Sequence, residues 1–117
     1  MTAVIPAGVQ LVLDVRPLVT PPHVEGASIQ DRFESFHDLN PWVLDALEQL
    51  TADYVVRGRR RLGIKMLVEV LRWQYGRATT GDDFKLNNNY SSRYVRLIQE
   101  RHPEWSDVFQ TRELLAV

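Results

Sequence analysis

Apolar side chains at helical spacing between residues 41 and 57 constrain the fold of this chain most strongly. Asn40 and Pro41 are typical of a helix start, because a proline at the first helical position loses no hydrogen bond. The apolar positions that follow form one stripe at i, i+3, i+4, i+7 and i+11: Val43, Ala46, Leu47, Leu50 and Tyr54. Gly58 supplies a left-handed C-cap. The pattern predicts an amphipathic helix over residues 41–57 that must bury one face.

Three further segments show the same period. Ser28 begins the first, with Asp31 in the capping-box position. The second covers residues 62–75. Its apolar stripe consists of Ile64, Leu67, Leu71 and Tyr75, and three further apolar side chains widen that stripe: Met66, Val70 and Trp73. Lys65 and Glu69 are spaced in it as an i,i+4 ion pair. Three asparagines at 87–89 supply the N-cap of the third.

These segments predict an all-α fold of four or five helices around one core, in a helical domain over residues 27–117. The 41–57 and 62–75 helices should pack together through Leu47, Leu50, Leu67 and Leu71, because both stripes are too apolar to face water. A helix-turn-helix or winged-helix-like arrangement is one alternative, with residues 77–86 as a loop or minor hairpin whose Phe84 and Leu86 face inward. However, about eleven residues separate the 62–75 helix from the last helix, which is more than the roughly 3–4 residues of the usual helix-turn-helix turn.

Residues 1–26 form an extended arm or a disordered tail, since they contain four prolines. Apolar residues alternate with others at Val9, Leu11, Leu13 and Val15, which indicates weak strand character. The two interpretations are a poorly ordered tail and an edge strand or arm that packs on a partner.

Composition excludes several classes of protein. A chain of 117 residues has room for one domain, and the absence of cysteine excludes disulfides, thiolate nucleophiles and cysteine-ligated zinc. No window reaches the roughly 18 apolar residues of a membrane span, and the first residues lack the basic region of a signal peptide. We therefore expect a cytoplasmic protein that does not enter a membrane.

No residue pattern predicts catalysis, a metal site or a cofactor. His23, His37 and His102 stand alone, without a second metal ligand at helical spacing. Asp82 and Asp83, with Lys85 close by, faintly resemble a magnesium-dependent nuclease site, but a turn in which they bond local N–H groups is the favoured interpretation. We expect a protein that is not an enzyme.

The charge distribution points to nucleic acid. Residues 1–56 hold 8 acidic and 2 basic side chains, whereas residues 57–72 hold 6 basic and 1 acidic. Guanidinium groups at a helix start suit phosphates, so we expect phosphate contacts from Arg59, Arg60, Arg61 and Lys65. The last helix begins like a recognition helix, with candidate base contacts at Asn88, Ser92, Arg93 and Arg96. The sequence therefore predicts a DNA-binding regulatory protein.

Two alternatives remain open. The arginines of the basic segment could form a solvated face that pairs with Asp45, Glu48 or Asp53 of the preceding helix, and the asparagines could serve only as an N-cap. The chain would then be a protein-interaction module that inhibits or modulates a host or defence protein through its acidic half or its arm. A homodimer is compatible with either function.

The stretch from about Phe33 to Leu114 resembles small uncharacterised proteins of bacterial phages, prophages and mobile elements. The resemblance rests on Asn40-Pro41, the block RRRLGIKMLVEVLRW from Arg59 to Trp73, the block from Gly81 to Trp105 and a closing TREL at 111–114. It implies a phage or mobile-element context. That group carries no assigned activity, so the resemblance implies no chemistry for any residue.

Overall fold

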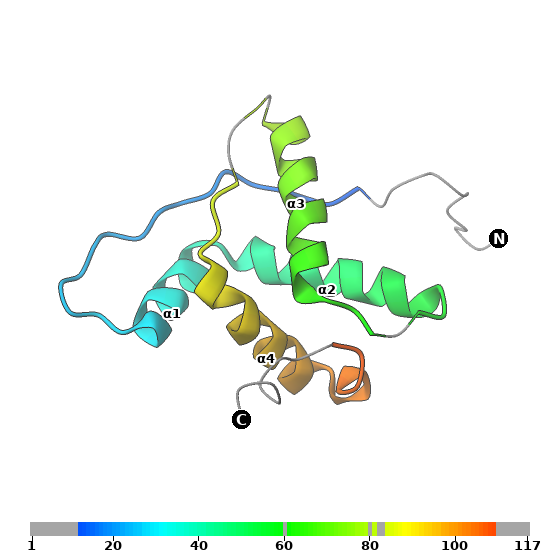
Figure 1. Ribbon diagram of the computed structural model, residues 1–117. Coiled ribbons are helices and arrows are strands. Elements are labelled where there is room, and N and C mark those ends of the chain that lie inside the picture. Colours follow the sequence, from blue (N-terminus) through cyan, green and yellow to red (C-terminus); the bar gives the residue numbers. More distant parts are fainter. Residues whose placement is uncertain (1–11, 60, 80, 82–83, 110–117) are drawn as a thin grey trace.

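The computed structural model describes residues 12–59, 61–79, 81 and 84–109, and it shows the all-α fold expected from the sequence (Figure 1). Its elements in chain order are α1 (Ile29–Leu39), α2 (Pro41–Val56), α3 (Ile64–Ala78), the 3-10 turn η1 (Asn88–Tyr90), α4 (Ser91–Arg101) and the 3-10 turn η2 (Pro103–Trp105). The described residues form no β-strand, and Leu62 and Phe109 meet in an isolated parallel bridge.

Two of the expected helix caps are confirmed. The Ser28 hydroxyl accepts a hydrogen bond from the backbone N–H of Asp31 at 3.0 Å and caps α1. After α2, Gly58 has a φ of 79°, which an L-amino acid adopts only at a cost. The N–H groups of Gly58 and Arg59 donate to the carbonyls of Val55 and Tyr54, at 2.9 and 3.3 Å. This is the Schellman arrangement that satisfies the last carbonyls of a helix.

The third expected cap is wrong in its chemistry, although α2 does begin at Pro41. Asn40 occupies the N-cap position, but its side chain makes no capping hydrogen bond. The side chain is fully buried and bonds instead to the backbone of Val19 and to the carbonyl of Phe36. Asn40 therefore fixes the corner between α1 and α2 and attaches the arm to it.

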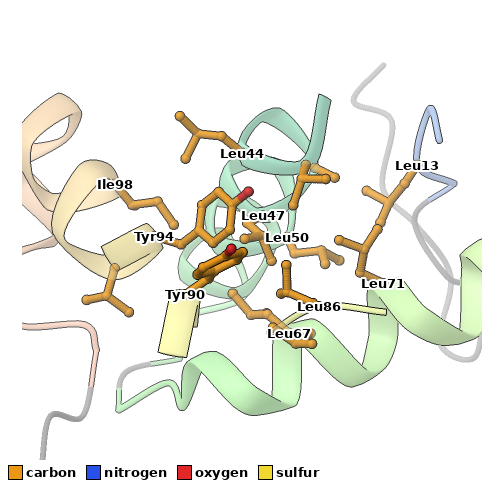
Figure 2. Packing of buried hydrophobic residues seen from close by; sticks show 14 of the residues in the cluster. Leu13, Leu44, Leu47, Leu50, Leu67, Leu71, Leu86, Tyr90, Tyr94 and Ile98 are labelled. Atoms are coloured by element: carbon orange, nitrogen blue, oxygen red, sulfur yellow. The ribbon is translucent and has the colours of Figure 1, made fainter. Parts of the chain in front are cut away.

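The core lies between α2, α3 and α4, and the expected α2–α3 contact is confirmed. Leu47, Leu50, Leu67 and Leu71 are all buried in one apolar cluster. Figure 2 shows Tyr94 and Tyr90 between the leucines of α2 and Leu67 of α3. Aromatic rings from α1 complete the cluster, and the Phe33 ring meets that of Tyr94 edge to face at 4.8 Å between centroids.

Two side chains expected to widen the buried stripe of α3 lie outside the core. Met66 is 47% exposed and Trp73 is 52% exposed, whereas Val70 does pack against the core. The apolar arc of α3 is therefore narrower than the sequence pattern indicated. It is centred on Leu67, Leu71 and Tyr75.

Residues 12–27 contain no helix and cross α3 before swinging out to α1 (Figure 1). Leu13 is buried, and its N–H donates to the side chain of Gln74 at 2.9 Å. The N–H of Leu18 donates to the Tyr75 hydroxyl at 3.0 Å. This part of the arm packs on its own domain, and it forms no strand; Val9 and Leu11 lie outside the described residues.

The connections on either side of α3 are longer than a helix-turn-helix turn. Residues 57–63 join α2 to α3, and residues 79–87 join α3 to η1. α3 itself continues to Ala78, into the segment considered for a hairpin. Phe84 and Leu86 are buried, as expected. The described residues of the considered hairpin segment form no strand.

Candidate nucleic-acid interface

The described arginines of the junction between α2 and α3 lie in solvent next to one residue that enters the core, Leu62. Leu62 is fully buried, and its N–H donates to the carbonyl of Val108 at 2.6 Å. Arg59 and Arg61, which precede Leu62 in the chain, are exposed. Arg60 lies outside the described residues.

Arg61 has an unusual backbone. Its φ of 65° is in the left-handed region, where it is the one described residue other than glycine. An L-amino acid in this region costs about 1–2 kcal/mol. Because the backbone turns there, the Leu62 side chain can enter the core while the side chain of Arg61 stays in solvent.

Only one described arginine of this junction is neutralised by the preceding helix. Nε of Arg57 lies 3.1 Å from the carboxylate of Asp53, one turn earlier in α2. Among the described carboxylates, none forms an ion pair with Arg59 or Arg61. The expected internal pairing of the arginines therefore holds for Arg57 alone within this part of the chain.

Lys65 lies in the first turn of α3, next to the junction, and is exposed. The expected i,i+4 pair with Glu69 is wrong: Glu69 pairs with Arg72 instead. Arg72 also donates from Nε to the carbonyl of Phe84 at 3.4 Å, which directs its guanidinium group along the helix. Lys65 consequently has no carboxylate partner among the described residues. Gly63, at the N-cap of α3, offers no side chain to the N–H groups of the first turn.

Of the asparagines before α4, Asn87 caps a helical turn and Asn88 lies exposed on the surface. The Asn87 side chain accepts from the N–H of Asn89 at 2.8 Å and caps η1, as an asparagine N-cap was expected to do. Asn88, Ser92 and Arg96 are exposed. They follow one another at intervals of four residues, so they share one face of η1 and α4.

Arg93 is turned away from that face. Its Nε donates to the side chain of Gln30 in α1 at 2.9 Å, and its Nη1 donates to the carbonyl of Asn89 at 3.0 Å. This guanidinium group therefore fixes α4 to α1. A base contact from Arg93 would require both hydrogen bonds to be exchanged.

The structure does not unite the two groups of candidate residues. In Figure 1 the start of α4 lies beside α1, whereas the junction before α3 lies at the far end of α2. No hydrogen bond or ion pair among the described residues links Arg59, Arg61 or Lys65 to α4. They form two separate polar surfaces, and the junction carries the denser positive charge.

A charged cluster that sequence reasoning missed connects α2 to the end of α4. The Glu48 carboxylate is nearly buried and lies 2.9 Å from Nε of Arg101 and 3.1 Å from Nε2 of His102. The His102 ring stacks on Trp105, with centroids 4.1 Å apart, and its Nδ1 lies 3.3 Å from Glu104. No local pattern marks this cluster, because Glu48 and His102 are 54 residues apart.

Neither a metal-ligand cluster nor a membrane-spanning helix is found among the described residues. No group of three histidine or acidic side chains among them could hold a metal ion. Asp82 and Asp83, considered for magnesium, lie outside this part of the chain. None of its helices is long and apolar enough to cross a membrane.

Comparison with known proteins adds no relative. The chain matches no protein-family model, no curated protein and no solved structure. The geometry of its own side chains must therefore carry the functional argument.

Proposed function

We propose that this protein is a cytoplasmic DNA-binding regulatory protein, of the phage or mobile-element type, that holds phosphates at the α2–α3 junction. One observation carries the proposal. Arg59, Arg61 and Lys65 are exposed around the start of α3, without a carboxylate partner in the described part of the chain, while Arg57 and Arg72 are neutralised beside them.

The chemistry of this junction suits a phosphate. Guanidinium groups bind phosphate oxygens with two parallel N–H donors, and an ammonium adds a point charge. The first N–H groups of α3 add further donors and the positive end of the helix dipole. Arg60 belongs to the same sequence run and is proposed to contribute a further contact.

Base contacts are assigned to the second polar surface. Asn88, Ser92 and Arg96 share one exposed face, and asparagine and arginine form paired hydrogen bonds with adenine and guanine edges. Arg93 is proposed as the residue that orients α4 through Gln30. In this proposal Arg93 makes no base contact.

The salt dependence of binding tests the phosphate contacts. We expect an Arg59→Ala/Arg61→Ala variant to bind duplex DNA more weakly than wild type at low salt. Its slope of log affinity against log salt should be smaller by about two units, because each lost phosphate contact removes about 0.9. An Arg32→Ala/Lys85→Ala variant loses the same charge elsewhere and should keep the wild-type slope. Equal binding by wild type and the junction variant would end this proposal.

The arm favours the alternative of a protein-interaction module. Val19 and Val24 are exposed where the arm swings out, and an open cleft of about 580 Å³ lies between this loop and α1. Apolar side chains beside a cleft suit a protein partner. If wild type binds no DNA at low salt, substitution of Val24 and recovery of a defined complex becomes the next experiment.

A further inference from the structure

The outer face of α3 carries a tryptophan that the core does not use. Trp73 is about half exposed, and the guanidinium carbon of Arg77 lies 4.9 Å from the centroid of its ring. The cation covers part of the ring and leaves much of the indole in contact with water. A surface of this kind, aromatic and positively charged, suits the stacking of a nucleic-acid base.

Gly76 is a second, independent observation at the same place. It lies three residues after Trp73 and next to Arg77, so it belongs to the same side of α3. A Cβ at Gly76 would meet no atom within 4 Å, and its backbone is not left-handed. The fold therefore does not require glycine there, although alanine is the better helix former. Gly76 is half-buried, and the lack of a side chain lets another molecule approach the backbone closely.

The charges along this face complement a nucleic-acid strand. Lys65 lies on the same side of α3 as Trp73, eight residues away, which is about 12 Å along a helix axis. The carboxylate between them, Glu69, is already neutralised by Arg72.

We propose that Trp73, Arg77 and Gly76 form a stacking site for an unpaired base of single-stranded nucleic acid. The site rests on the nucleic-acid binding proposed above, with the phosphates of the same strand held by Arg59, Arg61 and Lys65. Paired bases present only their edges in the grooves of a duplex, so a stacking site favours single strands. Because every base has a flat face, the site tolerates any sequence.

The test compares a fluorescein-labelled oligothymidylate of about 12 nucleotides with a duplex of equal length. We expect Trp73→Leu to weaken binding of the single strand about tenfold and to leave duplex binding within about twofold, since stacking on an aromatic ring is lost. Trp73→Phe should retain most of the affinity. Gly76→Leu should weaken single-strand binding to a similar degree, because its side chain enters the space beside the indole. Leu39→Ala, at an exposed apolar residue of α1, serves as the matched control.

The outcomes separate this site from the phosphate contacts. Should wild type bind neither probe better than the Arg59→Ala/Arg61→Ala variant does, nucleic-acid binding and the stacking site both fail. Should the arginines matter while Trp73→Leu leaves single-strand affinity unchanged, the stacking site is wrong and phosphate binding stands. An equal loss on both probes would show that Trp73 does not select unpaired bases, and it would overturn the inference as well. Circular dichroism of each variant verifies that the helices are intact.

Discussion

The side-chain amide of Asn40 bonds to both backbone groups of Val19. Its Oδ1 accepts from the Val19 N–H at 2.8 Å, and its Nδ2 donates to the Val19 carbonyl at 2.8 Å. Nδ2 also donates to the carbonyl of Phe36 at 2.9 Å. One buried side chain thus replaces the strand partner that an extended segment would otherwise need, and it does so at the corner between α1 and α2.

Removal of this amide should destabilise the fold. Asn40→Ala loses three hydrogen bonds of about 0.5–1.5 kcal/mol each and leaves both backbone groups of Val19 without this partner, so we expect a loss of about 2–4 kcal/mol. Urea unfolding measures it. Asn88→Ala, at an exposed asparagine, should change stability by less than about 0.5 kcal/mol. Equal effects at the two positions would contradict the role assigned to Asn40.

The two sides of α3 should respond differently to truncation. Leu71 is fully buried, so Leu71→Ala should cost about 2–5 kcal/mol through lost burial and the cavity left behind. Met66 is exposed on the other side, and Met66→Ala should cost less than about 1 kcal/mol. Thermal and urea unfolding of both variants check this. A costly Met66→Ala would mean that the buried arc of α3 is assigned wrongly.

Stability should fall in strong alkali because of Tyr94. Burial, and secondarily the neighbouring Tyr90, raises the pKa of the Tyr94 phenol far above its usual value. The unfolded chain therefore releases this proton first, near pH 10, and stability declines as the pH rises through that range. Tyr94→Phe should reduce the decline.

Near neutral pH the same substitution should cost little. The Tyr94 hydroxyl is buried and finds no hydrogen-bond partner among the described residues, so its removal leaves no other group unsatisfied. Urea unfolding of wild type and Tyr94→Phe at pH 8 and pH 10.5 gives both comparisons. A large loss of stability at pH 8 would show that the hydroxyl has a partner.

Two substitutions of Arg61 should differ in their effect on stability but not in their effect on DNA binding. Glycine adopts a φ of 65° without steric cost, so Arg61→Gly should be more stable than Arg61→Ala by about 1 kcal/mol. Both variants lack the guanidinium group and should lose DNA affinity equally. Unfolding and DNA titration of the pair measure the two effects. If the two variants are equally stable, the backbone at residue 61 is not held in the left-handed region.

The parts of the fold that local chemistry determines could be predicted from the sequence. The Ser28 cap, the proline at the start of α2 and the glycine after it each depend on neighbours within a few residues. The period of the apolar residues then identified the α2–α3 contact. It could not locate Trp73 correctly, because a large side chain at the margin of a stripe lies inside or outside according to which neighbours cover it.

The candidate site was predictable only in part for a similar reason. The exposure of Arg59 and Arg61 follows from the helix boundary, which the sequence marks with Gly58. The partner of Arg93 is Gln30, 63 residues away, and that of Asn40 is Val19 on the arm. Such pairings depend on how the helices are arranged in space, so the spacing of residues along one helix cannot predict them.

The attachment of the arm to α3 has a consequence for synthesis of the chain. Leu13 leaves the ribosome early, yet the side chain that receives its N–H, Gln74, follows 61 residues later. At about 5–20 residues per second, that interval lasts roughly 3–12 seconds. During it Leu13 lacks the α3 surface on which it packs, although Val19 can already reach Asn40. Leu13 and Gln74 can therefore first meet when α3 has been completed.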